Sequence, residues 1–234
     1  VVSRDKNFGD DDIEATRKRC REQVALRRKV FGPQVDARPI NIDVGHQVLY
    51  YWDAGKYWFE FYPKSEKVES DFLKAIQVSL DAVKSASDAP VRLFVMDEPG
   101  GHPDLMKDTV YYNSLARQKS PGLKTFCTIG GGLSQGLDEI SILGEAIDEF
   151  TTNRFTPDIL ASLLQRKKPY GVYNGGSSAE AVRAFVRDRY FFGTYAWKTG
   201  ASEILQWVYA FGDPWKEPIR GNHGYAYPAP DGPL

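Results

Sequence analysis

Two adjacent acidic residues, Asp97 and Glu98, are the sharpest chemical signal in this sequence. They follow the apolar run Val91–Met96, which is typical of a strand buried on both faces, and precede Pro99. Neighbouring strand residues point to opposite faces, so both carboxyl groups can enter one pocket only where the strand ends, as Pro99 indicates. Repulsion between two close carboxylates raises one pKa. The pair therefore predicts an acid beside an anion; the alternative is a helix N-cap followed by a solvated acid.

The ends of the other expected strands carry polar and aromatic side chains. In chain order these are Thr128, Thr151–Asn153, Tyr173 with Asn174, and Trp207 with Tyr209. A sugar ring presents hydroxyl groups at its edge and C–H bonds on its faces, so such a lining around an acidic pair predicts a carbohydrate site. For the aromatic side chains core packing is the open alternative, and Trp197, on an expected helix, is expected to pack.

No metal site and no cofactor is predicted. The histidines His46, His102 and His223 are far apart and show no ligand spacing. Two cysteines are too few for a zinc cage, and Cys127 is expected to be a buried thiol. The glycine runs at 130–132 and 175–176 lack the other residues of a phosphate-binding loop, so they predict loops that need positive φ or close approach.

Helix and strand signals alternate along most of the chain. We expect strands beginning near 58, 91, 124, 146, 169 and 203, with helices at 11–30, 65–86, 105–118, from 157, and 177–198. Parallel strands need crossover helices, so the pattern predicts a (β/α)₈ TIM-type barrel over residues 1–234 that lacks its first one or two strands. An open, doubly wound sheet is the alternative.

Composition excludes several classes of protein. Lys+Arg is 30 and Asp+Glu is 31 in 234 residues, giving a formal charge of -1. This near-balance argues against nucleic-acid binding through bulk positive charge and against a basic face for anionic lipid. No apolar run approaches the roughly 18 residues of a membrane span. The first residues hold neither a signal-peptide core nor an initiator Met, so we expect a piece of a longer chain and leave localisation and oligomeric state open.

An ordered series of short segments resembles the catalytic domain of glycoside hydrolase family 123 and its uncharacterised relatives. The resemblance covers about residues 90–234, and residues 1–60 match only loosely. The segments are Asp97–Pro99, Thr128–Gly131, Tyr173–Gly176, Gly193–Lys198, Gln206–Tyr209, Asp213–Trp215 and Tyr227–Pro233. Two family features are absent from this sequence: a β-sandwich domain before the barrel and a closing helix after it.

The resemblance implies a barrel enzyme that hydrolyses β-linked N-acetylgalactosamine with retention, with the sugar's own acetamido oxygen as nucleophile. Such enzymes need no distant nucleophilic carboxylate. Glu98 would then protonate the leaving oxygen and later activate water, and Asp97 would orient the acetamido N–H. Tyr173, or else Tyr209, would hold the acetamido carbonyl, with Trp207 under the sugar. The alternatives are a glycosidase of this fold acting on a sugar without the acetamido group and a carbohydrate-binding protein without turnover.

Overall fold

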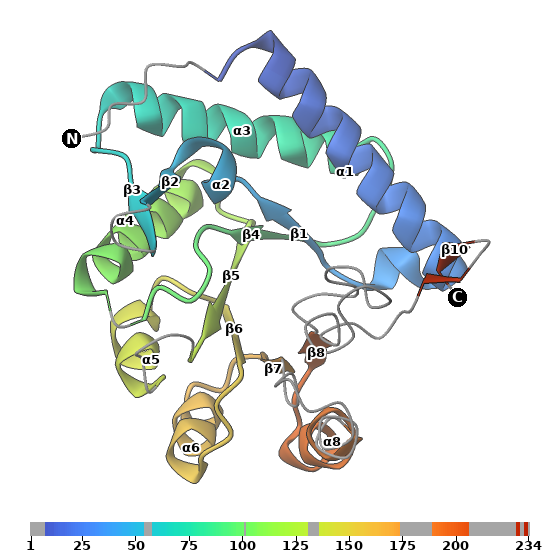
Figure 1. Cartoon of the computed structure of the whole chain (residues 1–234), viewed down its shortest axis with the longest axis vertical. Coiled ribbons are helices and arrows are strands. Elements are labelled where there is room, and N and C mark those ends of the chain that lie inside the picture. Colours follow the sequence, from blue (N-terminus) through green and yellow to red (C-terminus); the bar gives the residue numbers. More distant parts are fainter. Residues whose placement is uncertain are drawn as a thin grey trace.

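The computed structural model describes residues 8–53, 58–100, 102–130, 136–173, 189–205, 228–229 and 232–233 (Figure 1). Its helices are α1 (Asp10–Phe31), η1 (Gly32–Ala37, 3₁₀), α2 (Gly45–Val48), α3 (Glu66–Lys84), α4 (Pro103–Lys119), α5 (Leu137–Leu143), α6 (Pro157–Gln165), η2 (Arg189–Tyr195, π) and α8 (Ala196–Thr199). Its strands are β1 (Ile40–Asp43), β2 (Tyr50–Asp53), β3 (Trp58–Phe61), β4 (Val91–Phe94), β5 (Lys124–Ile129), β6 (Glu149–Thr152), β7 (Tyr170–Tyr173), β8 (Glu203–Leu205), β9 (Pro228–Ala229) and β10 (Gly232–Pro233).

Six strands form one parallel sheet in the order β1-β4-β5-β6-β7-β8. Every neighbouring pair in it is parallel, as the expected alternation of strands and helices requires. Helices α3, α4, α5 and α6 follow one another along the outer side of this sheet (Figure 1). The predicted α/β class is confirmed. Closure into an eight-stranded barrel remains a prediction.

The sheet is strongly curled, and a charge network across its concave side shows how much. Strands β4 and β8 are four places apart, which would separate them by about 19 Å in a flat sheet. Nevertheless Arg92 Nη2 on β4 lies 2.9 Å from Glu203 Oε2 on β8. The same guanidinium pairs with Glu149 on β6, and its Nε donates to Asn41 Oδ1 on β1 at 2.9 Å. The six strands of the parallel sheet therefore form a half-barrel.

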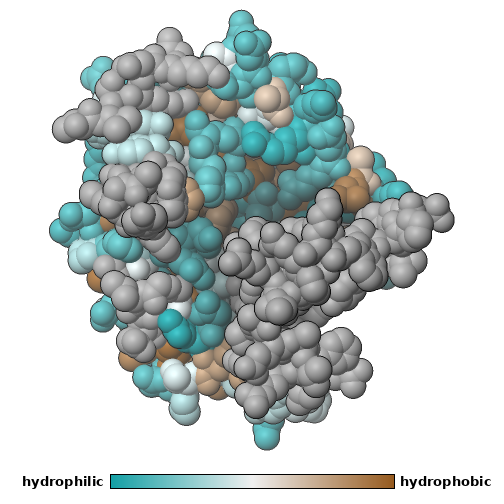
Figure 2. All heavy atoms as spheres, in the orientation of Figure 1, coloured by the Kyte–Doolittle hydropathy of each residue, from teal (hydrophilic) through white to brown (hydrophobic). Residues whose placement is uncertain are grey.

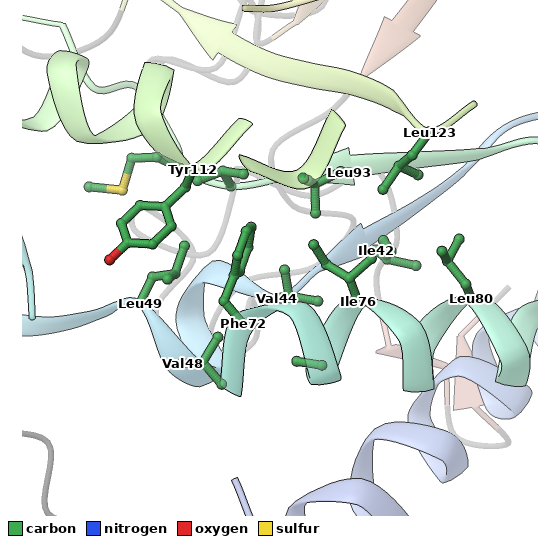
Figure 3. Close-up of a cluster of buried hydrophobic side chains, with 14 of the residues drawn as sticks. Ile42, Val44, Val48, Leu49, Phe72, Ile76, Leu80, Leu93, Tyr112 and Leu123 are labelled. Carbon is green, nitrogen blue, oxygen red and sulfur yellow. The ribbon is translucent and has the colours of Figure 1, made fainter. Parts of the chain in front are cut away.

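Helix α3 covers the outer side of β1 and β4, as its sequence pattern predicts. Apolar residues recur every three or four positions, so one face is continuous, and Ser65 Oγ accepts from the Val68 amide at 3.3 Å to cap the first turn. The close-up in Figure 3 shows Phe72, Ile76 and Leu80 of this face directed at the buried side chains of the sheet layer. This packing fixes β4, and with it the position of the acidic pair that follows.

The structure corrects two predicted strands: one pairs with a different partner, and the other begins at a later residue. The strand near 58 is β3, which pairs antiparallel with β2 and lies outside the parallel sheet. The connection between them, 54–57, is too short for the crossover of a dozen or more residues that a parallel pair needs. The first strand of the parallel sheet is instead β1. The strand expected at 146–150 begins only at Glu149, because Ala146 and Ile147 are held in a turn by the Leu143 carbonyl.

The expected packing role of Trp197 is also wrong. Trp197 lies on the single helical turn α8 and is 84% exposed. The residue that this turn buries is Ala196. Residues 177–188 and 206–209, where a helix and the end of the last strand were expected, lie outside the described residues. Across the described ranges, no helix combines the length and apolar character required to cross a membrane.

Candidate active site

The acidic pair lies at the carboxyl-terminal edge of the curled sheet, just past the end of β4. The strand ends at Phe94, and Glu98 has a φ of 43°, in the left-handed region that side chains rarely adopt. Thr128, at the end of the neighbouring β5, contacts both acids. Its hydroxyl donates to Asp97 Oδ1, and its Oγ1 accepts the Glu98 amide at 3.2 Å. The strand break predicted from the sequence is thus present, and Thr128 holds the pair in it.

Groups from β6 and β7 hold the Glu98 carboxylate. The Tyr173 hydroxyl, at the end of β7, donates to Glu98 Oε1. Asn153 follows β6, and its Nδ2 donates to the same oxygen at 3.4 Å. Tyr173 is 4% exposed, so its ring fills the concave side while its hydroxyl faces the acid. Four of the residues expected at strand ends therefore meet around Glu98: Asp97, Thr128, Asn153 and Tyr173.

Burial raises the pKa of both acids. For Asp97 burial is the main cause, opposed by the Thr128 hydroxyl and by the charge of His46. For Glu98 burial is again the main cause; the Tyr173 hydrogen bond opposes it, and the Asp97 charge adds to it. The sequence argument expected repulsion to raise one pKa, whereas desolvation acts on both. Charged neighbours of both signs act on each acid: His46 lowers and Asp43 raises the pKa of Asp97, while Arg154 lowers and Asp97 raises the pKa of Glu98.

A close approach at Gly130 positions Arg154 beside the pair. Gly130 has a φ of 93°, and a Cβ there would lie 2.5 Å from Arg154 Cγ and 2.8 Å from Asn153 Oδ1. Arg154 Nε donates to the Gly130 carbonyl at 2.6 Å, and the arginine charge lowers the pKa of Glu98. The predicted need for positive φ or close approach is confirmed at this first glycine of the run.

The sequence analysis missed a second cluster at the end of β1. Nδ1 of His46 lies 2.9 Å from Asp43 Oδ2 and 2.6 Å from the Tyr50 hydroxyl. This one nitrogen can either donate a hydrogen bond to the Asp43 carboxylate or accept one from the Tyr50 hydroxyl. The Asp43 hydrogen bond is the main reason that the pKa of His46 is raised, and the charge of Asp97 raises it further. The sequence signal for this cluster is Asp43 at the end of β1, a four-residue strand that the sequence analysis does not include among the sheet strands.

The remaining candidates divide into inert and undescribed residues. Cys127 is 1% exposed, and burial raises its pKa well above the usual range, so it is the expected inert thiol. Within the described ranges no three His, Cys, Asp or Glu side chains are grouped to hold a metal ion. Asn174, Trp207 and Tyr209 lie outside the described residues.

Comparison with known proteins adds no relative. No protein-family model matches the chain, and no curated protein sequence is significantly similar to it.

Proposed function

We propose that this chain is a glycoside hydrolase that cleaves β-linked N-acetylgalactosamine or a similar 2-acetamido sugar with retention. One observation carries the proposal: two consecutive, half-buried carboxyl groups at the carboxyl-terminal edge of a curled parallel sheet, one hydrogen-bonded from β5 and the other from β7. This edge is where barrel enzymes place their catalytic residues. The choice of a 2-acetamido sugar rests on the sequence resemblance.

Glu98 acts as the general acid and then as the general base. Its raised pKa keeps a larger share of the group protonated near neutral pH than an exposed glutamate would have. The proton passes to the glycosidic oxygen while the acetamido oxygen attacks the anomeric carbon, and the aglycone leaves as an alcohol. Glu98, now a carboxylate, takes a proton from water, whose oxygen opens the oxazoline ring. The two inversions at the anomeric carbon give retention.

Asp97 serves as the anion that receives the acetamido N–H. Burial disfavours its carboxylate form, and the Thr128 hydroxyl and the positive charge of His46 oppose that effect. An N–H that becomes more acidic as the oxazolinium forms binds more tightly to this carboxylate in the transition state than in the ground state. Such differential binding lowers the barrier of the chemical step.

Tyr173 connects the two events. In the free chain its hydroxyl donates to Glu98 Oε1, which favours the anionic form of that acid. When Glu98 carries its proton, the phenol can donate instead to the acetamido carbonyl. The same hydroxyl therefore orients the sugar's nucleophile in the first step and stabilises the Glu98 carboxylate in the second.

The test is turnover of an aryl N-acetyl-β-galactosaminide by the wild-type chain and by Glu98→Gln. The variant should lose about 10²–10⁴ in kcat, which is the usual contribution of general acid–base catalysis. Glu145→Gln is the matched control, since this glutamate is exposed and lies before β6, away from the pair. Wild-type activity in Glu98→Gln would overturn the assignment.

A substrate panel separates the sugar from the chemistry. Turnover of plain aryl β-galactosides but not of their 2-acetamido counterparts would keep the acids and replace the substrate. Binding of 2-acetamido sugars without product release, measured by tryptophan fluorescence and a product assay, would instead indicate a carbohydrate-binding protein.

A further inference from the structure

A pocket with polar and apolar lining residues lies between helix α1 and the edge strand β1. Its volume is about 290 Å³, near the lower end of small-molecule sites, which span roughly 300–1,000 Å³. The buried residues Cys20, Ile42 and Ser79 form its inner wall. The outer lining is polar throughout and consists of Arg19, Gln23, Asn41, Asp43, His46 and Gln47.

The pocket is built by a helix that turns a polar side to the sheet edge. Thr16, Arg19 and Gln23 lie three and four positions apart, so they share one side of α1. Thr16 Oγ1 donates to Gln47 Oε1 at 2.8 Å, and Gln47 Nε2 donates to the Asp43 carbonyl at 2.6 Å. These bonds join α1 to α2 and to the end of β1, so one wall of the pocket is preorganised.

The pocket lies on the Asp97 side of the acidic pair. Asp43 lines it and is paired with Phe94 in the register of β1 and β4, three residues before Asp97. His46 also lines it and follows Gly45, where a Cβ would lie 1.9 Å from the Val95 carbonyl oxygen. The charges of Asp43 and His46 both act on Asp97. Glu98 turns the other way, toward β6 and β7, where Asn153 and Tyr173 hold it. A ligand in the pocket would therefore lie beyond Asp97, opposite the acid. Figure 2 shows that hydrophilic residues predominate over the described part of this face.

The lining favours a neutral, hydroxyl-rich ligand. Amide, guanidinium and carboxylate groups are planar and can each bond two neighbouring hydroxyl groups, and this pocket holds all three kinds. The half-buried Gln23 amide makes no hydrogen bond to any other described residue, and Asn41 Oδ1 is occupied by Arg92, which leaves the Asn41 N–H groups for a ligand. The lining holds basic residues, Arg19 and His46, as well as the Asp43 carboxylate, so opposite charges offset one another in the pocket.

We propose that this pocket is a second sugar-binding subsite, which receives a ring attached to the sugar whose bond is cleaved. The inference rests on the proposed function, in which Asp97 contacts the 2-acetamido group of that sugar and Glu98 faces the leaving group. The preferred substrate is then an oligosaccharide that carries at least one further ring on the non-leaving side.

The test uses the Glu98→Gln chain, whose turnover should be slow enough for binding to be measured, and two ligands. One is an aryl N-acetyl-β-galactosaminide; the other is the same glycoside with a galactose attached to its N-acetylgalactosamine. The double variant Arg19→Met, Gln23→Leu should bind the larger ligand roughly tenfold more weakly, which is the scale of two lost hydrogen bonds. Its affinity for the smaller ligand should be unchanged. Gln118→Leu, on exposed α4 surface, is the matched control. The side-chain amide signals of Gln23 and Asn41 should move in NMR spectra only with the larger ligand.

Other results overturn one proposal without the other. Equal loss for both ligands, or no loss for either, would remove the subsite while leaving the hydrolase proposal intact. Shifts of the Gln23 and Asn41 signals with inorganic phosphate instead of the larger glycoside would make the pocket an anion site. Pocket binding of the larger glycoside by a wild-type chain that never releases product would keep the subsite and remove the hydrolase.

Discussion

At the residue scale, the surroundings of the acidic pair disfavour its charge, and the backbone conformation of Glu98 is unfavourable. Asp97 and Glu98 are half-buried, so both lose part of their hydration, and Glu98 has a backbone conformation that non-glycine residues seldom take. Strain and desolvation of this kind cost stability and persist where they serve function. The candidate site should therefore be a place where removing a charge makes the fold more stable.

Asp97→Asn should raise the melting temperature at neutral pH. Burial raises the folded-state pKa of Asp97 above its unfolded value, so the wild-type fold loses stability as the pH rises through the folded-state pKa. Asparagine does not ionise but can still accept the Thr128 hydrogen bond. Each unit of pKa difference corresponds to about 1.4 kcal/mol, and each kcal/mol to about 2–4 °C in a chain of this size.

Thermal unfolding of both chains from pH 4 to 8 checks this. The advantage of Asp97→Asn should grow with pH, while Asp88→Asn, at an exposed position, should follow the wild type. An advantage that shrinks as the pH rises would contradict the account.

Tyr173→Phe should raise the pKa of Glu98 further. Burial is the main cause of the present shift, and the Tyr173 hydrogen bond opposes it by stabilising the anion. Without the phenol the proton is held more tightly, so the alkaline limb of kcat/KM against pH moves upward. Titration of the Glu98 carboxyl carbon by ¹³C NMR gives the pKa independently of activity. Tyr170→Phe, on the same strand but bonded to the Thr199 carbonyl, should leave the Glu98 pKa unchanged; a fall in Tyr173→Phe would refute the assignment.

At the element scale, α2 can pack closely against the end of β4 because its first residue, Gly45, has no side chain. A Cβ at Gly45 would lie 1.9 Å from the Val95 carbonyl oxygen and 2.5 Å from Tyr50 Cε1. This contact brings Tyr50 and His46 to the Asp97 side of the site. The position of the second cluster therefore depends on a glycine that the sequence alone does not distinguish from the others.

Gly45→Ala should lower the free energy of unfolding by about 1–3 kcal/mol, the usual cost of overpacking, or more where backbone must move. Gly122→Ala is the control, because a Cβ there meets nothing within 4 Å. Urea unfolding of the two variants gives the comparison. Equal stability would show that α2 does not pack against β4 this closely.

Elements with a strong apolar pattern could be predicted, and short ones could not. The spaced apolar face of α3 and the continuous run of β4 identify both elements. By contrast β1 is only four residues long, and its sequence Ile-Asn-Ile-Asp does not reveal that its partner is β4, in which Leu93 pairs with Ile42, 51 residues earlier. Because β1 was missed as a sheet strand, Asp43 and His46 were missed as site residues, whereas Thr128, Asn153 and Tyr173 follow strands that were found.

At the scale of the whole molecule, one buried arginine ties the concave side of the half-barrel together. Arg92 is 3% exposed and bonds to residues of β1, β6 and β8. No local pattern in the sequence links these strands, since the contacts exist only because the sheet curls. The curl in turn brings Tyr173 on β7 to Glu98 beyond β4, so the candidate site depends on it.

Arg92→Met should lower the free energy of unfolding by about 3–5 kcal/mol, because it leaves two mostly buried carboxylates without their cation. Arg17→Met, whose side chain is half exposed on α1, should change stability little. Adding Glu149→Gln and Glu203→Gln to Arg92→Met should recover part of the loss. Urea unfolding decides: an Arg92→Met chain as stable as Arg17→Met would mean that the network does not hold the curl.

The most direct measurement compares two leaving groups on the same sugar. Phenyl N-acetyl-β-galactosaminide needs a proton on its leaving oxygen, whereas the 2,4-dinitrophenyl glycoside does not. With Glu98 as the acid, Glu98→Gln should lose about 10²–10⁴ in kcat/KM, which reports the first chemical step, on the phenyl substrate and far less on the dinitrophenyl one. The kcat on the dinitrophenyl substrate should still fall, because the second step has lost its general base. Asp97→Asn should lose rate on both. Equal losses for Glu98→Gln on the two substrates, or leaving-group sensitivity in Asp97→Asn instead, would contradict the account.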